Sequence, residues 1–80
     1  MKARVHITLK AGVLDPQGKA IANALCALGF EGVNGVRQGK YIEIDVDETD
    51  PERAKAAVTD MCVKLLANTV IEDYAIELDA

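Results

Sequence analysis

Hydrophobic and polar residues alternate in several short stretches of the chain. The alternation is clearest at residues 5–9, and it returns at residues 41–47 and 74–79. A period of two is typical of a β-strand with one buried and one solvent-facing side. Residues 33–38 show a weaker alternation, interrupted by Gly35, which we interpret as a bulged strand in a hairpin with residues 41–47. The pattern therefore predicts four strands.

Two other stretches repeat apolar residues every three or four positions, which is the spacing of an amphipathic helix. Each begins at an Asp-Pro pair, Asp15-Pro16 or Asp50-Pro51. Aspartate caps free backbone N–H groups, and proline suits the first helical position. We expect the first helix over residues 16–28 and the second to end near Ala67. The expected buried positions are Ile21, Ala24, Leu25 and Leu28 in the first helix and Ala54, Ala57, Val58, Met61, Cys62, Leu65 and Leu66 in the second.

The element order is βαββαβ, which is the order of ferredoxin-like α+β folds. Charge predicts how the strands are arranged, because unlike charges on neighbouring strands attract. The first strand has Arg4, His6 and Lys10 on its polar side, whereas the third and fourth strands have carboxylates there. We therefore expect a four-stranded antiparallel sheet of order 4-1-3-2 with two helices on one face. Residues 1–80 would form a single domain.

Composition limits the classes of function. A chain of 80 residues builds only a small core, so we expect self-association to support it. Residues 1–40 have a net charge of +4 and residues 41–80 of −8, and these halves attract each other. The total of −4 and the absence of Trp argue against nucleic-acid binding.

The same sequence predicts a cytoplasmic protein. The N-terminus enters a strand pattern directly, without the apolar run of a signal peptide, and no stretch has the length of a membrane span. Cys26 and Cys62 both fall in apolar helical stretches, where a reduced thiol behaves as a small hydrophobe.

Reactive side chains are too few for a catalytic site. The chain has no Ser and one His, His6, which is expected on a solvent-facing strand side. Cys26 and Cys62 lack metal-ligand spacing. The carboxylates at 43, 45 and 47 lie about 6.5 to 7 Å apart along a strand, which favours a solvated face over a cation site. We expect no catalytic residue, cofactor or metal in this chain.

A contact surface fits other residues better. Val13 and Leu14 are apolar residues in a predicted loop, where either local packing or a partner surface would explain them. Residues 68–73 raise the same alternatives. Arg37 and Lys40 bring two cations to a hairpin, which suits either an acidic partner patch or a plain polar turn. The candidate subunit-contact residues are Val13, Leu14, Arg37, Lys40, Asn68, Val70, Ile71 and Tyr74.

Four strings of residues are specific enough to compare with known families: Thr8-Leu9-Lys10, Val13-Leu14-Asp15-Pro16-Gln17-Gly18, Val36-Arg37-Gln38-Gly39-Lys40 and Ala67-Asn68-Thr69-Val70-Ile71-Glu72-Asp73-Tyr74. They resemble the PurS family, and the resemblance spans nearly the whole chain. The resemblance implies the small, non-catalytic subunit of phosphoribosylformylglycinamidine (FGAM) synthase. This enzyme of purine biosynthesis makes FGAM from formylglycinamide ribonucleotide (FGAR), glutamine and ATP.

The resemblance also implies partners. In that family a glutaminase subunit, PurQ, releases ammonia, and a large synthetase subunit, PurL, uses ATP and magnesium. A PurS homodimer or tetramer assists their assembly and the transfer of ammonia between them. Two alternatives remain from the residues themselves. One is a ligand-sensing ferredoxin-like module; the other is an acylphosphatase-type hydrolase, which the absence of Arg from residues 11–15 disfavours.

Overall fold

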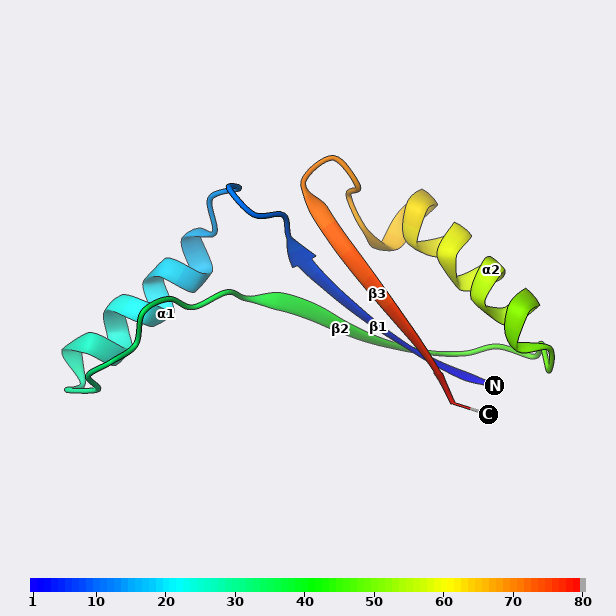
Figure 1. The fold of residues 1–80 in the computed structure, drawn as a ribbon, viewed down its shortest axis with the longest axis horizontal. Coiled ribbons are helices and arrows are strands. Elements are labelled where there is room, and N and C mark those ends of the chain that lie inside the picture. Colours follow the sequence, from blue (N-terminus) through cyan, green and yellow to red (C-terminus); the bar gives the residue numbers. More distant parts are fainter. Residues whose placement is uncertain (80) are drawn as a thin grey trace.

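The computed structural model describes residues 1–79 as a three-stranded sheet with two α-helices and one π-helical turn (Figure 1). The antiparallel sheet has the order β2-β1-β3. Its strands are β1 (Lys2–Leu9), β2 (Gly39–Asp45) and β3 (Glu72–Asp79). Helix α1 spans Pro16–Ala27, and helix α2 (Pro51–Met61) continues into the π-helical turn η1 (Cys62–Leu66). No helix in this described part has the length and hydrophobicity that crossing a membrane requires.

Both helices begin at their Asp-Pro pairs, as predicted. The Asp15 carboxylate accepts a hydrogen bond from Gly18 N at 2.9 Å, and the Asp50 carboxylate accepts one from Glu52 N at 3.0 Å. Each aspartate thereby satisfies a donor that has no partner inside the helix. Gly29 follows the end of α1 with φ +93°, a left-handed conformation that glycine adopts without strain.

The predicted central position of β1 is confirmed. Arg4 lies opposite Glu43 on β2 and Glu77 on β3. The Arg4 guanidinium lies 3.1 Å from a Glu77 carboxylate oxygen and 2.9 Å from one of Asp79. Ion pairs as exposed as these add little stability, so their main effect is to favour this strand order over others.

The predicted strand over residues 33–38 is absent, because this segment forms no ladder with β2. The observed order β3-β1-β2 therefore matches strands 4-1-3 of the predicted order 4-1-3-2. The segment instead approaches the first turn of α1, where a Cβ on Gly18 would collide with the Val36 carbonyl oxygen. The Gln38 N–H donates to Asp15 rather than to a neighbouring strand. Contacts with α1 thus replace strand pairing.

The prediction that both helices cover one face of the sheet is wrong for α1. In Figure 1, α1 and the segment that leads to β2 project to one side of the sheet, and α2 lies on the other side. We name residues 11–38 the arm. The arm makes the molecule elongated, with extents of 48 × 26 × 15 Å. The radius of gyration is 15.9 Å, against about 12 Å for a compact chain of this length.

The core lies between the sheet and α2. No apolar side chain of α1 belongs to it, because Gly18 is the buried residue of that helix. The core-side residues of both outer strands remain half-buried, Ile42 and Ile44 on β2 and Ile76 and Leu78 on β3. Helix α2 packs mainly against β3, so the β2 half of the sheet lacks a helical cover. The buried side chains are Ala3, Val5, Ile7, Ala54, Val58, Cys62 and Ala67.

The π-helical turn explains why Leu65 is not in the core. Ala67 N donates to Cys62 O at 2.9 Å, five residues back, so this turn holds more residues than an α-helical turn. Cys62 is fully buried and Leu66 half-buried, whereas Leu65 is 83% exposed. The prediction of burial is also wrong for Ala57 and Met61, which are exposed.

Candidate subunit-contact surfaces

The eight candidate contact residues gather at one end of the sheet. The strands are antiparallel, so this end holds the end of β1 and the starts of β2 and β3. Lys10 N donates to Ile71 O at 2.8 Å, which joins the loop after β1 to the loop before β3. Lys40 Nζ lies 3.7 Å from a Glu72 carboxylate oxygen. We name this region the strand-end surface: Val13, Leu14, Arg37, Lys40, Asn68, Val70, Ile71 and Tyr74.

Three apolar residues of the strand-end surface are exposed to solvent. The exposed fractions are 73% for Leu14, 81% for Val70 and 38% for Ile71. Val13 is half-buried. Local core packing therefore does not account for Leu14 or Val70 in this chain.

A hydrogen-bonded turn places Val70 at the tip of the loop before β3. The Asn68 side-chain oxygen accepts from Val70 N at 3.2 Å, and its backbone oxygen accepts from Glu72 N at 2.7 Å. The Glu72 carboxylate in turn accepts from Asn68 N at 2.7 Å. Asn68 shapes the turn with both its side chain and its backbone, so its side-chain oxygen and its backbone N–H and carbonyl groups are already engaged within the chain.

Two members of the surface have structural roles. Tyr74 lies opposite Ile7 on the core side of the sheet and packs, half-buried, against the core. The Arg37 guanidinium donates to the backbone oxygen of Leu9, so this cation is held at the base of the arm. Lys40 remains more than half exposed beside Glu72.

The base of the arm encloses a cleft of about 250 Å³. The Asp15 carboxylate at its edge accepts from Gln38 N and Gly18 N, each at 2.9 Å. These two hydrogen bonds lower the pKa of Asp15, and the bond from Gln38 N has the larger effect. The charged groups here are already engaged within the chain, Asp15 by backbone N–H groups and Lys40 by Glu72. The cleft is lined by Ile7, Leu9, Asp15, Gln17, Gln38, Gly39, Lys40 and Glu72.

The apolar side of the arm is a surface that the sequence did not reveal. Leu28 is 75% exposed and Phe30 is 59% exposed, while Ile21 and Val33 are each 40% exposed. The spacing of Ile21 and Leu28 showed that the helix needs a cover, and we assigned that cover to the chain's own sheet. One feature of the sequence could have indicated this surface: Phe30, the one Phe of the chain, lies outside every predicted helix and strand.

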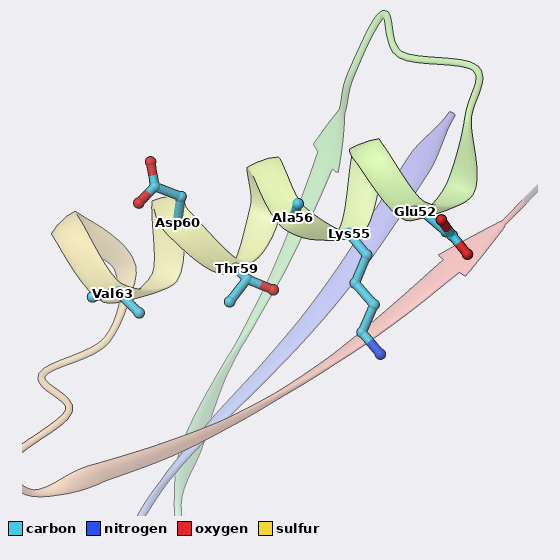
Figure 2. A pocket seen from close by; sticks show the side chains of 6 residues that line it. All are labelled: Glu52, Lys55, Ala56, Thr59, Asp60 and Val63. Atoms are coloured by element: carbon cyan, nitrogen blue, oxygen red, sulfur yellow. The ribbon is translucent and has the colours of Figure 1, made fainter.

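A third surface runs along α2 and η1. Figure 2 shows a shallow depression in which Lys55 and Thr59 project from the same side of α2. Its charged residues do not converge on a point, and Asp60 is paired with Lys64 at 2.9 Å. Met61, Val63 and Leu65 are exposed nearby and form what we name the outer α2 surface. The depression is lined by Glu52, Lys55, Ala56, Thr59, Asp60 and Val63.

The solvent-facing side of the sheet holds His6 in an aromatic pair. Its ring centroid lies 4.9 Å from that of Tyr41. The Tyr41 hydroxyl donates to Glu43 at 3.0 Å; desolvation, followed by this bond, raises the pKa of Tyr41. The arrangement stabilises neighbouring strands, and within residues 1–79 no nucleophilic side chain is hydrogen-bonded to His6.

Comparisons with known proteins place the chain in one family. The family model of PurS, phosphoribosylformylglycinamidine (FGAM) synthase, matches residues 2–80. The chain is 46% identical to the synthase subunit PurS of Bacillus subtilis over 78 residues, covering 98% of this chain and 92% of that protein. It is similar to the crystal structure of Methanocaldococcus jannaschii PurS, with TM-score 0.88 and 49% identity over 98% of this chain and 94% of the other. A chain in the structure of PurLQS from Thermotoga maritima matches with TM-score 0.87 and 30% identity, covering 95% and 93% of the two chains. With near-complete coverage at this identity, the chain belongs to the PurS family.

Proposed function

We propose that this chain is the small, non-catalytic subunit of an FGAM synthase. That enzyme converts FGAR, glutamine, ATP and water to FGAM, glutamate, ADP and phosphate. The observation that carries the proposal is the near-complete match to PurS proteins, including a chain of PurLQS from Thermotoga maritima. ATP and magnesium belong to the large subunit, not to this chain. Two free cysteines suit the reducing cytoplasm.

The role we propose is to hold a glutaminase subunit and a synthetase subunit together. Ammonia that escapes into water is protonated and diluted before it reaches a second active site, so the two sites must be kept close and shielded. A subunit that does this needs surfaces rather than reactive groups. The exposed apolar residues of the strand-end surface, such as Leu14 and Val70, suit contacts with the two larger subunits.

Reconstitution with the two larger subunits tests this role. Omitting this chain should abolish glutamine-dependent FGAM formation while synthesis from added ammonium chloride continues. Adding the chain back should restore the glutamine-dependent rate without changing the ammonia-dependent rate. Equal glutamine-dependent turnover with and without the chain would contradict the proposal.

We also propose that the chain forms a homodimer through its arms. The arm exposes Leu28 and Phe30, while Ile42 and Ile44 on the sheet are only half-covered. In a twofold dimer each arm would cover the open half of the partner's sheet, so the same contact would form twice. Such exchange would provide the core that a chain this short cannot build alone. The outer α2 surface stays free in this arrangement and suits a tetramer of two dimers.

A further inference from the structure

Two of the strings that characterise the chain meet at the base of the arm. Asp15 belongs to the string at residues 13–18 and Gln38 to the string at residues 36–40. Asp15 Oδ2 accepts a hydrogen bond from Gln38 N at 2.9 Å across 23 residues of sequence. The other carboxylate oxygen caps α1 through Gly18 N. One side chain therefore joins the start of the arm to its end.

Gly18 allows the two strings to come this close, because a Cβ there would collide with the Val36 carbonyl oxygen. Beside it, a Cβ on Gly39 would collide with the Ile7 carbonyl oxygen, so the start of β2 also lies tightly against β1. Gly18 is buried although it lies in an exposed helix. The start of α1 and the end of the arm are thus in backbone contact, which only glycine permits.

Arg37 ties the same place to the sheet. Its guanidinium donates to the backbone oxygen of Leu9, the last residue of β1. Asp15 and Arg37 therefore hold both chain segments that enter the arm, one on each side of its base. A hydrogen bond with a charged donor or acceptor is stronger than a neutral one, so these two contacts resist bending of the arm.

The second Asp-Pro pair shows that this geometry exceeds what a helix cap requires. Asp50 caps α2 through Glu52 N and otherwise contacts Arg53 within its own helix, at 3.8 Å. Asp15 caps α1 in the same way but also binds a residue 23 positions away. The chain thus contains a matched control for the capping role alone.

We propose that Asp15 and Arg37 form a latch that fixes the direction in which the arm leaves the sheet. For self-association, the inference rests on the homodimer proposed above. A rigid arm presents Leu28 and Phe30 to the second copy already oriented, so association does not have to order it. The latch thereby strengthens the dimer without contacting the partner.

The direction of the arm can be measured apart from dimer formation. Spin labels on the exposed Cys26 of α1 and on Lys55→Cys of α2 report the distance between arm and core by double electron–electron resonance, because Cys62 is buried and stays unlabelled. An excess of unlabelled protein restricts the signal to one chain. Asp15→Ser keeps a capping oxygen but cannot reach Gln38 as well. It should broaden the distance distribution, whereas Asp50→Ser should leave it narrow.

Self-association provides the second measurement. In sedimentation equilibrium, Asp15→Ser should raise the dimer dissociation constant about tenfold, the effect of losing roughly one charge-assisted hydrogen bond, and Asp50→Ser should not. Arg37→Met leaves both helix caps intact and should raise the dissociation constant as Asp15→Ser does. It replaces Asp15→Ser as the test if that variant folds poorly. The latch would be overturned if the distance distribution of Asp15→Ser, or of a folded Arg37→Met variant, were as narrow as that of the wild type. A monomeric wild type would instead overturn the proposed dimer, and the distance measurement would still decide on the latch.

Discussion

Lys2 and Glu43 form an ion pair across strands β1 and β2, with Lys2 Nζ 2.9 Å from Glu43 Oε2. The contact is diagonal, because the residue directly opposite Lys2 is Asp45. The hydrogen bond between the two side chains lowers the pKa of Glu43 and raises the pKa of Lys2. The pair is one of several in which the basic central strand meets the acidic strands beside it.

The lowered pKa of Glu43 predicts how stability depends on pH. Its contribution is fully present above the ordinary pKa of a glutamate and is lost as the pH falls through the lower folded value. Glu43→Gln should therefore lower the melting temperature slightly at neutral pH, and the difference should shrink in acid and in high salt. Glu31→Gln on the arm is the control and should show no such trend in thermal unfolding. A difference that is constant with pH would contradict the assignment.

Substitutions in the core should separate Ile7 from Leu14. Ile7 is fully buried, so Ile7→Ala should destabilise the fold by about 2–5 kcal/mol, much of the margin of a chain this small. Leu14 is 73% exposed, and Leu14→Ala should cost roughly 0.5 kcal/mol or less in the isolated chain. Urea unfolding measures both. Similar losses would mean that Leu14 is packed in solution.

Charge placed on the strand-end surface should affect assembly more than folding. We expect Leu14→Asp and Ile71→Asp to weaken binding to the two larger subunits, because a carboxylate would have to be buried in the contact. The melting temperature of the isolated chain should change less, and Thr69→Asp in the same loop serves as the control. Calorimetric titration measures binding, and a large loss of stability with normal assembly would place both residues in the core.

Charge placed on the arm should affect self-association. Phe30 is 59% exposed in the single chain, and we expect Phe30→Asp to shift the protein to a monomer. Val63→Asp adds the same charge to the outer α2 surface and should leave the dimer intact. Size-exclusion chromatography with light scattering gives the mass of each. An unchanged mass for Phe30→Asp would exclude the arm as the dimer contact.

Gly18→Ala should destabilise the chain although alanine favours helices. In an open helix the change would stabilise by about 1 kcal/mol. Here the new methyl group would collide with the Val36 carbonyl oxygen, a backbone atom that cannot move away alone. Gln17→Ala, at an exposed position of the same turn, is the control. A higher melting temperature for Gly18→Ala would show that the backbone at Val36 moves away and accommodates the methyl group.

Local patterns were sufficient for much of the fold. The alternation of residues 5–9 and 74–79 and the caps Asp15 and Asp50 are confirmed, because each depends on neighbours within a few residues. The central position of β1 was also predictable, since like charges on β2 and β3 would repel if those strands were neighbours.

The position of α1 was not predictable in this way. The spacing of Ile21 and Leu28 shows that the helix needs an apolar cover, but it does not show which molecule provides the cover. The strand predicted over residues 33–38 is absent for a related reason. Contacts of this segment with Asp15 and Gly18 replace hydrogen bonds to β2. The predicted burial of Leu65 was wrong because the extra residue in the π-helical turn η1 cannot be recognised from the spacing of apolar residues.

The structure brings the candidate contact residues to one end of the sheet, but the sequence did not reveal the structural role of each one. Leu14 and Val70 were recognisable as apolar residues in loops, and they are exposed. Arg37 looked like a free cation because its backbone acceptor lies 28 residues away, which no local pattern reveals.

The half-covered sheet makes the fold of each copy depend on how many copies are present. When the arms complete each other's sheets, pairing adds to the stability of each fold, so the unfolding midpoint rises as the protein is concentrated. At high dilution the folded monomer should therefore unfold at a lower temperature than the dimer. A cell that makes too little of this subunit would then hold copies that are less stable as well as fewer.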